Sequence, residues 1–319
     1  MSQSNKKNLN SEDVNLPGLL SIATVAALTT VLLWGGSSMV TKLGTQSMDG
    51  FSLGILRVIA AGPCALIIIG ILGLRIPWHN GSRVHFCLIS IMAMLGTIIF
   101  TLGVQYTTAG HAVVASSATA IFTGLIEAGF RRQWPSSRWW TGITVGFFGA
   151  IILIAESLGL GISQATWYGD LLCMLGAFCG SFGFYLGGRM SIIYGAKTVS
   201  LWSVVFACIL LIPALIVSVS YEEISKISLL SWGVIFYLAA GASVIASMTW
   251  LYALSRGGIG RMAVWQFALP IVGVSLAWAV LKEPITMPLL ASIAVILIGI
   301  ALVQAEKPDL NVLDRTKKG

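Results

Sequence analysis

The chain has 319 residues, of which 56% are hydrophobic and only 10% carry a charge. Soluble globular proteins have about 25% charged residues, so this composition excludes most soluble classes. The formal net charge of +7 does not indicate a nucleic-acid partner, because no basic face is interleaved with aromatic residues.

Five long apolar stretches follow a polar tail of residues 1–18, which we predict to be disordered and cytoplasmic. Each has close to the 17–25 residues that a helix needs to cross a hydrocarbon core at ~1.5 Å per residue. They cover residues 19–42, 51–74, 86–107, 111–130 and 139–158.

Five more apolar stretches of similar length complete the chain before a charged tail, residues 305–319, which we also place in the cytoplasm. A soluble protein can bury single apolar helices, but not ten in succession with only short connections. The sequence therefore predicts an all-α integral membrane protein with ten transmembrane helices. The second set covers residues 168–188, 198–219, 230–254, 260–281 and 285–304.

Lysine and arginine alternate between the gaps that separate these stretches. Fifteen of the 19 basic residues lie in the two tails or in every second gap, and the opposite gaps hold three. Basic residues resist translocation, so the rich side is predicted to be cytoplasmic and both termini to be inside. We expect a multi-pass protein of the plasma membrane, the inner membrane of a bacterium.

The chain also has a weak internal repeat. Shifting it by 150 residues aligns His111 with Arg261, Ala120 with Pro270, and Gln133 with Glu283. Ten helices divide into five plus five, residues 19–158 and 168–304, and an odd number inverts the second half relative to the first. Inverted repeats build secondary transporters. The alternative is that any two stretches rich in Gly, Ala, Leu and Ile look alike.

Several short motifs are spread over both halves of the chain. They are Trp34 to Ser38 with Lys42, Arg57, Tyr106 to Gly110, Gly169 to Leu172, Tyr252 to Arg256, Arg261 to Ala263, Pro270, and Lys282 to Thr286. As a set these motifs resemble the EamA-type carriers of the drug/metabolite transporter superfamily. The resemblance covers about residues 20–304 and implies two five-helix repeats around a substrate cavity. Ala120 and Gln133 depart from it, because the family has proline and glutamate at these positions of the first repeat.

Arg57 is the sharpest candidate for substrate binding. It lies about six residues, or roughly 9 Å, inside the outer end of the second predicted helix. An arginine inside a membrane helix costs about 2.5–3.5 kcal/mol on insertion scales and usually faces the protein interior or a wet cavity. Its planar guanidinium could bind a carboxylate or phosphate. The alternative is a structural arginine that snorkels outward or binds helix-end carbonyls.

Other candidates for the cavity wall are aromatic or polar residues within the predicted helices. Trp34, Tyr106, Tyr185, Trp250, Trp265 and Gln266 are the substrate-binding candidates. The aromatic residues could instead pack helix interfaces or form an interfacial belt. Pro270 removes a backbone donor and frees the carbonyl of Gln266, which predicts a conformationally adjustable point beside the cavity.

The remaining ionisable residues give little sign of proton coupling. Glu127 could relay protons or pair with Arg131 one turn away. Glu156 and Asp170 lie near predicted outer helix ends, where we expect them to be solvated. His111 opens a helix, where a histidine usually caps or lies on the surface. The five cysteines lack metal-ligand spacing, so no metal or other cofactor is expected.

These observations favour a secondary transporter that exports a small metabolite, such as an amino acid or a related compound, by alternating access. Alternatives are a channel, a non-transporting scaffold, or an intramembrane enzyme. The sequence has no HExxH, GxSxG or GxxxxGK[ST] motif, so we expect neither enzymatic activity nor ATP drive from this chain. The expected partners are the substrate and the lipid bilayer. The oligomeric state stays open, and a monomer is compatible with the sequence.

Overall fold

The computed structural model describes residues 22–77, 82–131, 136–160, 164–218, 227–257 and 264–304. Most of these residues are helical, and no strand occurs among them. Within these ranges, eight helices are long and apolar enough to cross a membrane. Two shorter apolar helices, Ala268–Leu281 and Met287–Leu302, follow them. The two predicted tails lie outside the described residues.

The helices follow the predicted apolar stretches, but several of them change their helical type on the way. The first half contains α1 (Ile22–Gly44), α2 (Gly50–Leu72), α3 (Ser82–Tyr106), α4 (Ala109–Ser117), α5 (Thr119–Arg131) and α6 (Ser137–Ala155), which continues as the π-helix η1 (Glu156–Leu160). The second half contains α7 (Trp167–Tyr194), α8 (Ala196–Ser218), α10 (Leu229–Phe236), the π-helix η2 (Tyr237–Ile245), α11 (Ala246–Gly257), the 3₁₀-helix η3 (Val264–Phe267), α13 (Ala268–Leu276), the π-helix η4 (Ala277–Leu281) and α14 (Met287–Gln304).

Side-chain caps fix where several helices begin. The Asp49 carboxylate accepts hydrogen bonds from the amides of Phe51 and Ser52 at the start of α2. Thr108 and Thr166 cap α4 and α7 in the same way. Such caps satisfy amide groups that have no partner within the helix. The caps therefore fix the first residues of α2, α4 and α7.

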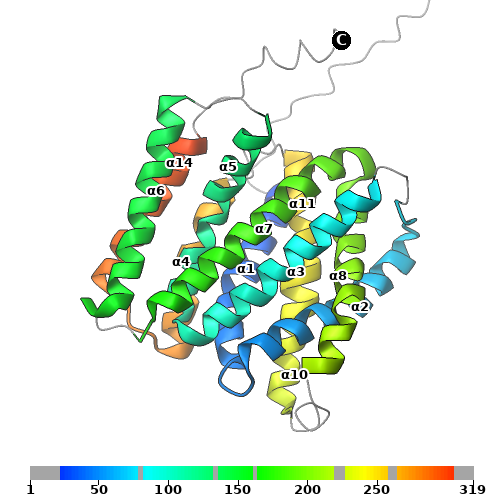
Figure 1. Cartoon of the computed structure of the whole chain (residues 1–319), viewed down its shortest axis with the longest axis horizontal. Coiled ribbons are helices and arrows are strands. Elements are labelled where there is room, and N and C mark those ends of the chain that lie inside the picture. Colours follow the sequence, from blue (N-terminus) through cyan, green and yellow to red (C-terminus); the bar gives the residue numbers. More distant parts are fainter. Residues whose placement is uncertain are drawn as a thin grey trace, which may run out of the picture.

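The helices pack in pairs that repeat between the two halves of the chain. In the five-plus-five division, α1 corresponds to α7, α2 to α8, α3 to α10–η2–α11, α4–α5 to η3–α13, and α6 to α14. Helix α3 packs along α7, and its counterpart α11 packs along α1. The pairs α2–α8, α4–α13 and α6–α14 each join equivalent helices, and Figure 1 shows α6 and α14 together at one edge of the bundle. This pairing is what two related halves around a pseudo-two-fold axis produce.

Glycines allow the largest helix pairs to touch through their backbones. A Cβ atom on Gly176 of α7 would lie 2.7 Å from the backbone nitrogen of Phe100 on α3. A Cβ atom on Gly299 of α14 would lie 2.5 Å from the backbone nitrogen of Gly146 on α6. Small residues are the usual means of close helix contact in membranes, where apolar burial alone does not distinguish protein from lipid.

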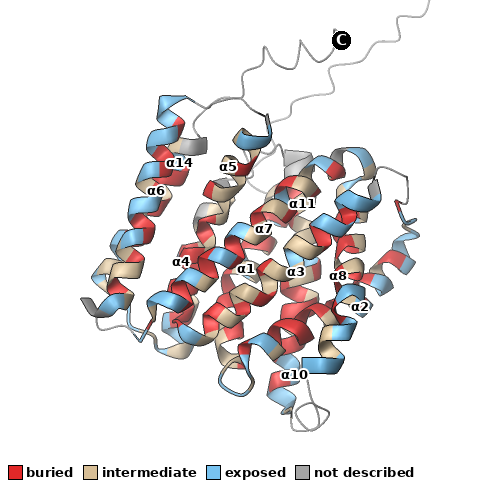
Figure 2. Ribbon diagram, in the orientation of Figure 1, coloured by how far each residue is buried: buried red, intermediate tan, exposed pale blue. Residues whose placement is uncertain are grey.

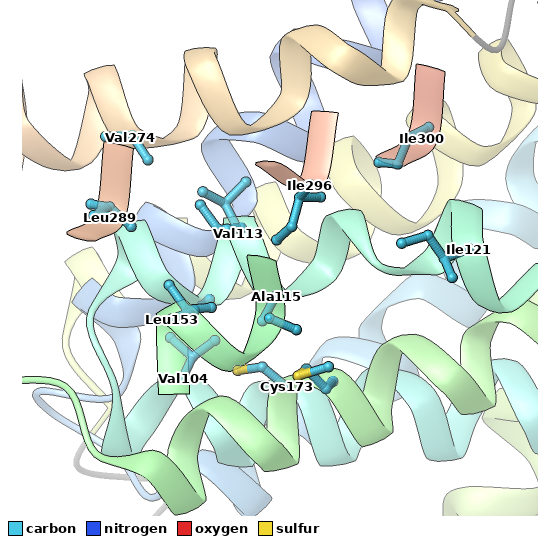
Figure 3. Packing of buried hydrophobic residues seen from close by; sticks show 14 of the residues in the cluster. Val104, Val113, Ala115, Ile121, Leu153, Cys173, Val274, Leu289, Ile296 and Ile300 are labelled. Carbon is cyan, nitrogen blue, oxygen red and sulfur yellow. The ribbon is translucent and has the colours of Figure 1, made fainter. Parts of the chain in front are cut away.

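Apolar side chains fill the space where α4 meets its neighbours from both halves. Figure 3 shows Val113 of α4 near Val274 of α13, and Leu289 and Ile296 of α14 beside them. Many apolar side chains also lie exposed on the outside of the bundle, including Phe148 and Ile151 of α6 (Figure 2). An apolar exterior over long helices is what a bilayer requires. The protein is a multi-pass membrane protein.

Candidate functional site

One face of the helix bundle carries the turns 45–49, 107–108, 164–166 and 282–286 together with His111, and we call it the His111 face. Contacts between these turns define it. The amide of Thr166 donates to the carbonyl of Tyr106, and the Thr286 hydroxyl donates to Glu156. The other ends of the helices form the opposite face, where α14 ends at Gln304.

A cavity of about 280 Å³ lies in the middle of the bundle and is lined by helices from both halves. Toward the His111 face its lining ends at Ser38, Arg57 and Phe100, each six or seven residues from the end of its helix, or about 9 Å. Toward the opposite face the lining reaches Val199 and Gln266, the fourth residue of α8 and the third of η3. The cavity is thus set back from the His111 face and extends toward the opposite one.

Arg57 contributes a buried positive charge to the cavity wall. Its Nε donates a hydrogen bond to Ser243 Oγ at 3.1 Å, and Ser243 in turn donates to the carbonyl of Leu238 at 2.8 Å. No carboxylate of the described residues lies within ion-pair distance of the guanidinium, and no further hydrogen bond to it occurs among them. The terminal nitrogens of Arg57 therefore remain able to bind an anionic group in the cavity.

The π-helix η2 shapes the wall next to Arg57. Trp34 Nε1 donates to the carbonyl of Ala242 at 2.9 Å, one residue before Ser243. Tyr237, at the start of η2, donates its hydroxyl proton to the carbonyl of Leu33 at 2.9 Å. π-helical turns often occur at functional sites, because the wider turn displaces side chains and carbonyls from their α-helical positions. Here it joins η2 to α1 and α2 around the cavity.

The predicted site residues divide into two groups. Arg57, Trp34 and Gln266 line the cavity. Trp250 is buried behind Trp34, with ring centroids 6.0 Å apart. The structure places the other three candidates elsewhere. Tyr106 packs on Tyr168 at the His111 face, Tyr185 stacks on Phe130, and Trp265 packs against Ala23, Ala26, Ala27 and Ala253.

Pro270 is buried in the first turn of α13, directly after the 3₁₀-helix η3. The preceding residue, Leu269, lines the cavity, as does Gln266 four residues before the proline. A proline at this position cannot donate to the Gln266 carbonyl, and the helix changes its hydrogen-bonding pattern here. The role of Pro270 as an adjustable point of the helix stays a prediction.

Hydroxyl groups supply most of the remaining polarity of the cavity, which the sequence reasoning missed. The available signal was the recurrence of serine at helical spacing within apolar stretches, most clearly on α8. The lining serines are Ser37, Ser38, Ser116, Ser117, Ser200, Ser203, Ser243 and Ser247.

A second polar cluster lies at the His111 face, and it corrects three predictions. His111, Glu156 and Asp170 are exposed by 1%, 2% and 0%, so the two carboxylates are not solvated and the histidine is not at the surface. Asp170 accepts hydrogen bonds from Thr107 and Ser157, and its Oδ2 lies 3.0 Å from His111 Nδ1. Sequence alone gave no reason to place these residues together, because they come from three different helical segments.

Charged residues also cap helix ends at this face. Lys42 Nζ donates to the carbonyls of Val104, Gln105 and Thr107 at the end of α3. The Glu283 carboxylate accepts from the amides of Ala109 and Gly110, at 2.8 and 2.9 Å, at the start of α4. A cation at a helix C-terminus and an anion at an N-terminus both complement the helix dipole. These contacts close the His111 face above the cavity.

The described residues contain no group of three or more His, Cys, Asp or Glu side chains arranged to hold a metal ion.

The EamA-like transporter family matches this chain twice, over residues 21–155 and 167–305. The chain belongs to this family. Both matches together span most of the sequence, so the family's two-repeat architecture applies to the EamA protein described here.

Relatives of this EamA protein are named as transporters. One from Archaeoglobus fulgidus, an uncharacterized transporter, is 26% identical over 80% of this chain and 87% of its own. An uncharacterized inner membrane transporter of Escherichia coli is 23% identical over 86% and 88%. A protein of the same organism named a probable amino-acid metabolite efflux pump is 24% identical over 82% and 88%. A solved crystal structure with 17% identity has the same fold, with a TM-score of 0.63 over 93% of this chain and 99% of that one.

Proposed function

We propose that this EamA protein is a secondary transporter that exports a small metabolite, such as an amino acid or a related compound, by alternating access. The observation that carries the proposal is the cavity between the two repeats, which is closed at the His111 face and has Arg57 in its wall. Secondary transporters of repeat architecture bind substrate between the repeats near the middle of the membrane.

The proposed orientation assigns the His111 face to the outside. Ten crossings with both termini in the cytoplasm follow from the alternation of basic residues. The cavity then extends toward the cytoplasm, as in an inward-facing state that accepts substrate from inside. Export is supported further by the relative named as an efflux pump.

The lining favours a small carboxylate-bearing substrate with an apolar part. Arg57 offers a forked donor for a carboxylate, the serine hydroxyls can bind an amine or amide, and Trp34 offers an apolar surface. A volume of about 280 Å³ lies at the lower end of the ~300–1,000 Å³ typical of ligand sites. Tyr106, Tyr185, Trp250 and Trp265 have no direct part in this proposal, because they do not line the cavity.

The proposed location is the bacterial inner membrane, supported by the relative from that membrane. One chain contributes every wall of the cavity, so a monomer can transport. We propose no enzymatic step and no cofactor.

Counterflow in proteoliposomes tests the transport proposal. Vesicles are loaded with one unlabelled metabolite at high concentration, and the same metabolite in labelled form is added outside. The measurement is repeated for a panel of amino acids, other carboxylates, amines and sugar phosphates. We expect faster labelled uptake than in protein-free vesicles for at least one carboxylate-bearing amino acid or close relative. Folded protein that accelerates no member of the panel would contradict transport and favour a non-transporting scaffold.

A further inference from the structure

His111 lies between two carboxylates with its whole side chain buried. Its Nδ1 is 3.0 Å from Asp170 Oδ2, and its Nε2 is 3.4 Å from Glu156 Oε2. His111 lies in the first turn of α4, Glu156 begins η1, and Asp170 lies in the first turn of α7. The cluster therefore joins the end of the first repeat to the start of the second.

The second of these contacts lacks a hydrogen bond. Among the described residues, neither His111 Nε2 nor Glu156 Oε2 has a hydrogen-bond partner, although both atoms are buried and face each other. The other Glu156 oxygen accepts from the Thr286 hydroxyl, and the other imidazole nitrogen faces Asp170. A buried polar group left without a partner is costly, so unpaired atoms facing each other call for an explanation.

Counting protons explains this pair. A neutral imidazole carries one N–H, which can serve either the Asp170 contact or the Glu156 contact, but not both. With the proton on Nδ1, the lone pair of Nε2 faces the lone pairs of Glu156 Oε2, and the two repel. One additional proton, on Nε2 as imidazolium or on Oε2 as a carboxylic acid, removes this repulsion and lets the two atoms, now 3.4 Å apart, approach and form a hydrogen bond.

The neighbouring titratable groups are already engaged. Lys42 on α1 donates to three carbonyls, and Glu283 before α14 uses both oxygens on the amides of α4. Cys173 on α7 donates to the carbonyl of Phe100, and the Tyr106 ring on α3 packs at a tilt against Tyr168. None of these side chains contacts the pair, so the additional proton has to come from water.

We propose that the His111–Glu156 pair binds one proton from water at the His111 face, and that this proton holds the face closed. The proton passes from external water to Nε2 or Oε2 and returns to water when the face opens; no electron moves. In the open state water can solvate both groups separately, so the contact that the added proton completes exists only in the closed state. A ligand that prefers one conformation shifts the equilibrium toward it. The inference rests on the alternating access proposed above.

A reporter on α1 can measure this closure. Thr41 lies between the cavity residue Ser38 and Lys42 and is fully buried. Its hydroxyl has no hydrogen-bond partner among the described residues, so Thr41→Cys removes no hydrogen bond there. Its labelling by an impermeant thiol reagent from outside, read by peptide mass spectrometry, reports opening. The exposed Gln46→Cys, measured at each pH, corrects for thiol reactivity.

We expect the labelling rate of Thr41→Cys, divided by the rate of Gln46→Cys at the same pH, to fall as the external pH falls. A single linked proton limits this decrease to about tenfold per pH unit. Adding Glu156→Gln should make labelling slow and independent of pH, because the amide N–H donates to His111 Nε2 without an added proton. His85→Gln and Glu127→Gln remove the same side-chain types at the other ends of α3 and α5, and should leave the pH dependence unchanged.

Labelling that does not depend on pH, or a folded Glu156→Gln variant with the wild-type pH dependence, would overturn the proton site while leaving alternating access intact. Should Glu156→Gln fail to fold by melting in detergent, His111→Gln takes its place and should likewise remove the pH dependence. Thr41→Cys that is never labelled from outside at any pH would contradict the opening of this face, and with it both proposals. The counterflow assay separates these outcomes, because it measures transport directly and does not depend on the proton site.

Discussion

Single polar residues inside the helices carry most of the functional information in this protein. Arg57 and the His111–Glu156–Asp170 cluster are buried in a chain whose helices are otherwise apolar. Their burial costs free energy unless partners compensate it, and ionisable groups at membrane depth usually belong to functional sites. The two sites differ in their partners. Asp170 is fully hydrogen-bonded, whereas Arg57 has only Ser243 among the described residues.

Substitution of Arg57 tests whether it binds substrate. Arg57→Lys keeps the charge but loses the planar fork, so we expect substrate affinity to fall markedly, and Arg57→Gln should lower it further. A lost charge-assisted hydrogen bond is worth roughly 1.5–3 kcal/mol, or about 10- to 150-fold in affinity. Affinity and melting temperature are measured on the same purified variants, with the substrate found by counterflow.

The matched control is Arg75→Gln, which removes an exposed arginine beyond the end of α2 and should change neither quantity. If Arg57 is structural, its variants should instead melt at lower temperature while the remaining folded protein binds normally. Unchanged affinity in folded Arg57→Gln would remove this residue from the site.

At the scale of whole elements, the helices combine rigid contacts with local departures from α-helical geometry. Glycines bring α3 against α7 and α6 against α14 at backbone distance. By contrast, η2 is π-helical where it meets Arg57 and Trp34, and η3 is a 3₁₀-helix where it reaches the cavity. The irregular turns therefore lie beside the cavity, whereas these glycine contacts join other helices.

Adding one methyl group at a glycine contact tests its contribution to stability. A Cβ atom on Gly176 would lie within 2.8 Å of the backbone of α3, so Gly176→Ala should separate the two helices. We expect a loss of roughly 1–3 kcal/mol, the usual cost of overpacking, seen as a lower melting temperature in detergent.

Gly70 on α2 is the matched control, because a Cβ atom there would meet nothing within 4 Å. Gly70→Ala should be neutral or stabilising by up to about 1 kcal/mol, since alanine favours the helix more than glycine does. Equal melting temperatures for the two variants would contradict close packing between α3 and α7.

At the scale of the whole molecule, the two repeats give the bundle two different faces. Lys42, Glu283 and the His111 cluster close one face, while the cavity approaches the other. Two related halves can exchange such arrangements without a change in the helices themselves. The asymmetry between the faces is what alternating access requires of any one conformation.

Cysteine labelling in intact cells tests the orientation of these faces. Gln46→Cys lies in the turn after α1 and should react with an impermeant thiol reagent from outside. Ser136→Cys, before α6 at the opposite face, should react only after the membrane is permeabilised. The reverse pattern would place the His111 face in the cytoplasm and turn the proposed exporter cavity outward.

Much of the fold could be predicted from the sequence, because apolar length and motif resemblance are local properties of the chain. Each of the ten predicted stretches contains a helical segment, and the family match confirms the EamA resemblance. The breaks inside them could not be predicted. The stretch 111–130 divides at Ala118 into α4 and α5, and 230–254 passes through η2, because contacts with other helices favour these local geometries over a continuous α-helix.

The sequence by itself determined a membrane protein of the EamA family and singled out Arg57, Trp34 and Gln266, which do line the cavity. It did so because hydrophobicity and the cost of a buried arginine are set by residue type and position along one helix. Only the tertiary structure decided that His111 and Glu156 face each other, with Asp170 beside them. Their burial depends on which sides of separate helices meet, and half a turn of rotation of one helix would direct its side chain away from the other two.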